Sequence, residues 1–67
     1  MSNEGMWIKV TNADTGRRVA VNLLHVITVR ENDRESVFSG KKALIDFSDG
    51  TTLATAEDFD QIGEMIR

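Results

Sequence analysis

The 67-residue sequence contains no cysteine, no proline and a single histidine, His25. The lack of cysteine excludes disulfide bonds and thiol nucleophiles, and with one histidine it also excludes zinc sites built from several Cys or His ligands. His25 has no carboxylate within two residues, so a structural polar residue at a strand boundary is its better interpretation. We therefore predict no catalytic residue, no cofactor, no metal site and no enzymatic activity.

Long apolar runs are absent as well. The longest purely apolar stretches are three residues, far too short for a membrane-spanning helix. The N-terminus has no basic segment followed by an apolar one, as a secretory signal requires. A cytoplasmic protein without a membrane partner is the expectation.

Excess positive charge is also lacking. The net charge is −3, and residues 1–56 carry as many basic as acidic side chains, so the negative excess lies in residues 57–67. Nucleic-acid binding depends mainly on Lys and Arg side chains that neutralise phosphates, so the composition disfavours it. Only a local basic patch could support such binding. The acidic residues between positions 46 and 60 lack the spacing of a calcium loop, which disfavours a cation site.

The sequence is rich in β-branched residues. They are concentrated before position 56, with no proline to interrupt them. They predict a single α+β domain over 1–67, a five-stranded antiparallel β-meander with one C-terminal helix, for which a barrel-like arrangement is an alternative. Residues 1–5 are expected to be a disordered tail and 31–36 a solvated loop. The expected strands cover 6–12, 17–22, 24–30, 42–48 and 51–55, and the helix covers 56–66.

The first expected hairpin has two acceptable registers. A two-residue loop at 15–16 pairs Val10 with Val21, whereas a four-residue loop at 13–16 pairs Val10 with Val19. Both place apolar residues opposite each other and on one face, so the sequence leaves the choice open.

The second expected hairpin has a definite register. Its Asp-Gly pair favours a tight turn, and a three-residue loop at 48–50 with a bulge at the glycine pairs Ile45 with Leu53 and Phe47 with Thr51. A two-residue loop would instead place Leu53 opposite a carboxylate, so we predict the bulged loop.

The C-terminal segment has the periodicity of an amphipathic helix. Its apolar residues recur at helical spacing and are expected to cover the sheet: Phe59, Ile62, Met65 and Ile66. Thr55 and Asp58 have the spacing of a capping pair, and Glu57 and Asp58 are expected in the first turn, near the positive end of the helix dipole.

A single helix covers one face of such a sheet and leaves the other open. Apolar residues compete for that second face, namely Trp7, Ala20, Leu24, Val26 and Leu44. A small domain without disulfides gains stability by covering such a face, so we predict a homo-oligomer and a non-catalytic interaction module with a protein partner. Val37 and Phe38 either extend the fourth strand or form a second apolar surface for that partner.

The alternative function is nucleic-acid binding. One aromatic residue and several cations lie on or near the first hairpin and the fourth strand: Trp7, Lys9, Arg17, Arg18, Lys41 and Lys42. A base can stack on an aromatic ring while cations hold phosphates. A single aromatic residue makes this the weaker of the two hypotheses.

Five segments together resemble the FlbD/SwrD-type small bacterial flagellar proteins. The segments lie at 7–11 (WIKVT), 19–22 (VAVN), 26–29 (VITV), 44–50 (LIDFSDG) and 59–62 (FDQI). The polar segment at 31–42 and the additional N-terminal residues depart from that family. The resemblance implies a non-enzymatic accessory protein that acts through contacts, and it assigns no catalytic residue.

Overall fold

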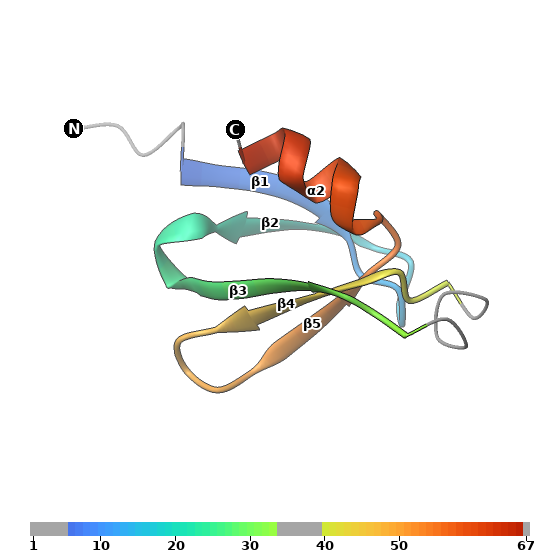
Figure 1. Cartoon of the computed structure of the whole chain (residues 1–67), viewed down its shortest axis with the longest axis horizontal. Helices are drawn as coiled ribbons and strands as arrows, with labels where there is room; N and C mark the ends of the chain where they lie inside the picture. The colour runs from blue at the N-terminus through green and yellow to red at the C-terminus, as the bar shows by residue number, and fades with distance from the viewer. Residues whose placement is uncertain (1–5, 34–39, 67) are drawn as a thin grey trace.

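The structure, a computed structural model, describes residues 6–33 and 40–66. In chain order they form β1 (Trp7–Thr11), β2 (Arg18–Asn22), a short 3-10 helix η2 (Leu23–His25), β3 (Val26–Glu31), β4 (Ala43–Phe47), β5 (Thr52–Thr55) and helix α2 (Phe59–Ile66). This is an α+β arrangement, as predicted (Figure 1). The expected tail at 1–5, the loop segment 34–36, and Val37 and Phe38 lie outside the described residues.

The strands form two sheets instead of one. β1 and β2 make a two-stranded antiparallel sheet, and β3, β4 and β5 make a three-stranded one in that order. The prediction of a single five-stranded sheet is therefore wrong, and the sheets are not closed into a barrel. The break lies at Asn22, whose side chain accepts a hydrogen bond of 3.0 Å from the Leu24 N–H and caps η2. This local turn redirects the chain before β2 and β3 can pair.

Each hairpin has a single register in the structure. Val10 pairs with Val19 and Ile8 with Val21, which is the four-residue-loop alternative for β1 and β2. β4 and β5 adopt the predicted bulged register, in which Ile45 pairs with Leu53. Gly50 has a φ of 89°, a conformation that glycine adopts without steric cost.

β3 differs from its prediction at both ends. It begins after η2, and a bulge leaves Ile27 without a partner and 68% exposed. It also continues to Glu31, where the expected loop begins, and Asn32 extends the pairing by donating its backbone N–H to the Lys42 carbonyl at 3.1 Å. The predicted start of the loop at residue 31 is therefore wrong, because β4 offers pairing partners to that point.

Helix α2 begins three residues later than predicted. Asp58 is its cap: Asp58 Oδ1 accepts from the Gln61 N–H at 2.8 Å, and Gln61 Oε1 accepts from the Asp58 N–H at 2.9 Å. The expected pair of Thr55 with Asp58 is wrong, because the Thr55 hydroxyl donates to the Glu57 carbonyl at 2.8 Å. Glu57 therefore precedes the helix and is free to bond elsewhere.

The core lies between the two sheets and the helix. It consists of buried side chains from both sheets and from α2: Ile8, Val10, Val21, Ala43, Ile45 and Ile62. The helix contributes only Ile62, since Phe59, Met65 and Ile66 remain 40–44% exposed. The predicted apolar stripe thus covers the sheets through one fully buried residue, and α2 lies against β1 and β3.

Candidate functional site

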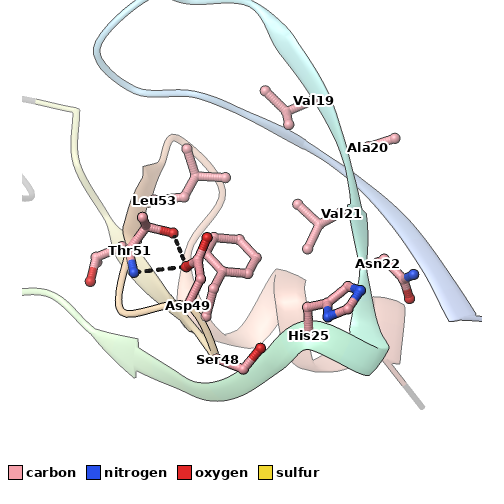
Figure 2. Close-up of a pocket in the computed structure, with 11 residues that line it drawn as sticks. Val19, Ala20, Val21, Asn22, His25, Ser48, Asp49, Thr51 and Leu53 are labelled. Atoms are coloured by element: carbon pink, nitrogen blue, oxygen red, sulfur yellow. Dashed lines mark hydrogen bonds between the residues drawn. The ribbon is translucent and has the colours of Figure 1, made fainter.

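A groove opens between the two sheets, with β2 on one side and the β4–β5 hairpin on the other (Figure 2). Its cavity volume is about 610 Å³, which is in the range of binding pockets. Residues of β2, η2 and the hairpin line it: Val19, Ala20, Val21, Asn22, His25, Phe47, Ser48, Asp49, Thr51, Thr52 and Leu53. We refer to this site as the groove.

The apolar part of the groove is continuous with the core. Val21 is buried, and Val19, Phe47 and Leu53 are partly buried and pack against the core cluster. Figure 2 shows Val21 and Leu53 projecting into the space between the two sides, whereas Ala20 points away from it. Because core packing fixes these side chains, the groove exists before any partner binds.

Hydrogen bonds hold the two sides of the groove in place. At one end, Asn12 bridges to Thr55, and the Ala13 N–H donates to the Ala54 carbonyl at 2.9 Å. Toward the other end, the Ser48 N–H donates to the His25 carbonyl at 2.8 Å. The separation of β2 from the hairpin is therefore set by the backbone.

The side of the groove formed by β2 is an open strand edge. The Asn12 N–H donates to the Arg17 carbonyl at 2.8 Å, and hydrogen-bonded and non-bonded pairs alternate along an antiparallel ladder. Val19 and Val21 therefore bond to β1, while the backbone groups of Ala20 point to the other edge. Among the described residues, no strand pairs with that edge.

The polar rim of the groove contains one carboxylate among the residues that the structure describes. Asp49 Oδ1 accepts from the Thr51 hydroxyl at 2.6 Å and from the Thr51 N–H at 2.9 Å. These bonds, the hydroxyl first, hold the pKa of Asp49 below its usual range, and His25 contributes a smaller electrostatic effect. Asp49 therefore stays ionised at the rim, and the fold places His25 near a carboxylate that is distant in sequence.

The structure brings three of the predicted site residues to one face. Trp7, Lys9 and Arg18 lie on the outer face of β1 and β2, and Lys9 and Arg18 line a small hollow of about 370 Å³. Trp7 is 47% exposed. Arg18 also acts electrostatically on Glu57, whose nearby carboxylate offsets part of the positive charge on this face.

The other predicted cations lie apart from that face. Arg17 is exposed in the turn before β2. Lys41 forms an ion pair of 3.2 Å with Asp14, and Lys42 is exposed beside β4. The structure therefore does not unite the six residues of the nucleic-acid hypothesis into one surface.

Two further features bear on chemistry. Within 6–33 and 40–66, no group of three His, Asp or Glu residues is placed to hold a metal ion, and no helix has the length and apolarity to cross a membrane.

Asp46 accepts two hydrogen bonds from Arg30, at 2.7 and 3.0 Å, and one from Thr52 at 2.9 Å. Its carboxylate thus serves to link the three strands of the second sheet.

The groove itself was not anticipated from the sequence. The register of each hairpin predicts that Val19 and Val21 share an inward face and that Phe47 and Leu53 share another. It does not predict that these two faces lie opposite each other. The missing signal is Asn22, a capping residue type between two strands, which indicates a break in the sheet. Comparisons of this chain with protein-family models, with curated proteins and with solved structures found no match.

Proposed function

We propose that this protein is a non-catalytic interaction module that binds a segment of a partner protein in the groove. The observation that carries the proposal is the apolar groove beside an edge of β2 with which no strand in the described part of the chain pairs. Apolar side chains such as Val21 and Leu53 supply binding energy when a partner removes them from water. The flagellar resemblance supports the same class of function, an accessory protein that acts through contacts.

A binding role fits the polar groups of the groove better than a catalytic one. Nucleophilic or acid–base catalysis needs an activated group held within hydrogen-bond reach of its partner. Here the Asp49 carboxylate is engaged by Thr51, and both His25 and Asp49 are exposed to water. Such groups orient a ligand at the rim of an apolar site.

The test is selection from a random peptide library displayed on phage, followed by measurement of affinity for the enriched peptides. Leu53→Ser removes an apolar side chain from the groove, so we expect peptide binding to weaken by about tenfold. The matched control is Ile66→Ser, because Ile66 is 43% exposed and does not line the groove. Thermal unfolding of both variants verifies that they remain folded.

Two results would overturn the proposal. One is that selection enriches no peptide above the level of an unrelated protein. The other is that Leu53→Ser, while still folded, binds the enriched peptides as tightly as Ile66→Ser does.

Nucleic-acid binding remains the second candidate, because Trp7, Lys9 and Arg18 share one face. It predicts that labelled single-stranded DNA or RNA binds at low salt, that salt weakens this binding, and that Trp7→Ala weakens it further. Absence of binding at low salt would contradict this candidate.

A further inference from the structure

We propose that the segment bound in the groove adds to β2 as an extended strand, with alternating apolar side chains and a basic residue beside Asp49. This inference rests on the proposed function, since it names the form and charge of the partner. Three independent features of the groove carry it: the open backbone edge, the spacing of its apolar side chains and the charge of its rim.

The backbone edge is the first feature. Ala20 directs its N–H and C=O away from β1, and by the alternation of the ladder the N–H of Asn22 points the same way. A strand laid along this edge forms main-chain hydrogen bonds that no described strand supplies. This is the mode of recognition called strand addition.

The apolar side chains are the second feature. Val19 and Val21 are two positions apart on β2 and face inward, opposite Leu53 on β5. Side chains of an added strand alternate between its two faces with the same period of two. Every second residue of the segment therefore meets this apolar wall, and the intervening residues face water.

The rim charge is the third feature. Among the described residues that line the groove, Asp49 is the one with a carboxylate, and none is a lysine or an arginine. Asp49 retains its charge because Thr51 donates two hydrogen bonds to it. Charge complementarity therefore favours a lysine or arginine in the segment where it passes the β4–β5 turn.

The sequences of the enriched peptides are the first test. Strand addition predicts apolar residues at every second position and a basic residue toward one end. Enriched peptides with apolar residues at helical spacing would contradict strand addition and leave the groove as a protein-binding site. Failure to enrich any peptide would overturn both proposals.

The backbone edge is tested by Ala20→Pro. Proline removes the outward N–H while the bonds from Val19 and Val21 to β1 remain, so it is compatible with an edge position. We expect it to weaken binding of an enriched peptide by about tenfold. The matched variant, Ala20→Val, keeps the N–H, so equal losses of binding in Ala20→Pro and Ala20→Val would contradict the role of the outward N–H.

A second measurement leaves the protein unchanged, in case Ala20→Pro fails to fold. N-methylation of alternate peptide amides blocks one edge of the added strand. One alternating set of methyl groups must abolish binding and the other must leave it intact. Equal tolerance of both sets contradicts strand addition.

The charge is tested by Asp49→Asn, which keeps an oxygen to accept from Thr51. An enriched peptide that carries lysine should bind about twofold to fivefold more weakly, as expected for an exposed ion pair. The same peptide with glutamine in place of lysine should be unaffected. The matched control is Asp60→Asn on α2, outside the groove, and equal effects of the two variants would overturn the assignment of Asp49.

Discussion

At the residue scale, the side chain of Glu57 joins two distant segments of the chain. Its carboxylate accepts from the Thr11 N–H at 2.7 Å and from the Thr11 hydroxyl at 2.9 Å, across 46 positions of sequence. Partial burial acts to raise the pKa of Glu57, but the bonds from Thr11 outweigh it, so the pKa lies below its usual range. The connection between β5 and α2 is thereby fixed to the edge of β1.

Glu57→Gln tests this contact. Because the folded-state pKa is lowered, the ionised carboxylate stabilises the fold above the usual pKa range of glutamate, and this contribution is lost as the pH falls through the folded-state pKa. We expect a loss of about 1 kcal/mol in the free energy of unfolding near neutral pH, and a smaller loss in acid. Urea denaturation at both pH values measures it, with the exposed Glu31→Gln as control. A difference that does not change with pH would contradict the role of the charge.

At the element scale, two glycines should respond in opposite directions to the same substitution. Neither has an atom within 4 Å of an added Cβ, so space does not distinguish them. Gly63→Ala, inside α2, should raise stability by about 1 kcal/mol, because alanine favours a helix. Gly50→Ala, at a φ of 89°, should lower it by a similar amount. The two shifts in melting temperature check this, and equal signs would contradict the assigned backbone conformations.

The elements that the sequence predicts correctly are those with local signals. The alternation of Ile8 with Val10 and the Asp-Gly turn predict two hairpins, because each is formed by residues that are close in sequence, but the alternation leaves the register of the first hairpin open. The division into two sheets depends on whether β2 and β3 pair, which the hydrophobic pattern does not determine. The start of α2 is set by the local pair of Asp58 and Gln61, and the sequence also offers Thr55 and Asp58 at the same spacing, so spacing alone does not identify the cap.

The same distinction between local signals and contacts of distant segments applies to the candidate site. Residues of a single hairpin, such as Trp7, Lys9 and Arg18, lie on one face because the alternation along each strand is a local property. The groove joins Val21 to Leu53 and His25 to Asp49, and each pair comes from two different hairpins or turns. Its existence requires the two sheets to face each other. Asn22 marks the break between them, but no local pattern in the chain specifies how they are placed relative to each other.

At the scale of the whole molecule, Ile62 is the only residue of α2 that is fully buried against both sheets. Ile62→Ala should therefore cost about 2–5 kcal/mol, a large part of the stability of a domain of this size. The matched control, Ile66→Ala on the same helix, removes a side chain that is 43% exposed and should cost less. Chemical denaturation compares the two, and equal losses would show that α2 is not held through Ile62.

Self-association is the second prediction at this scale. Leu24 and Ile27 are 59% and 68% exposed, and burial of such side chains between copies stabilises a small domain. We expect light scattering after size exclusion to give a mass above 7.5 kDa that falls toward it in Ile27→Ser. A monomer at every concentration measured would contradict this prediction without affecting the groove.

Amide hydrogen exchange, measured by NMR with and without an enriched peptide, tests strand addition at the groove most directly. In the free protein, the N–H groups of Ala20 and Asn22 should exchange rapidly, because they point out of an open edge, whereas those of Val19 and Val21 should be protected by β1. Addition of a strand predicts strong new protection of Ala20 and Asn22 when peptide binds. Unchanged exchange at these two amides in the saturated complex would contradict it.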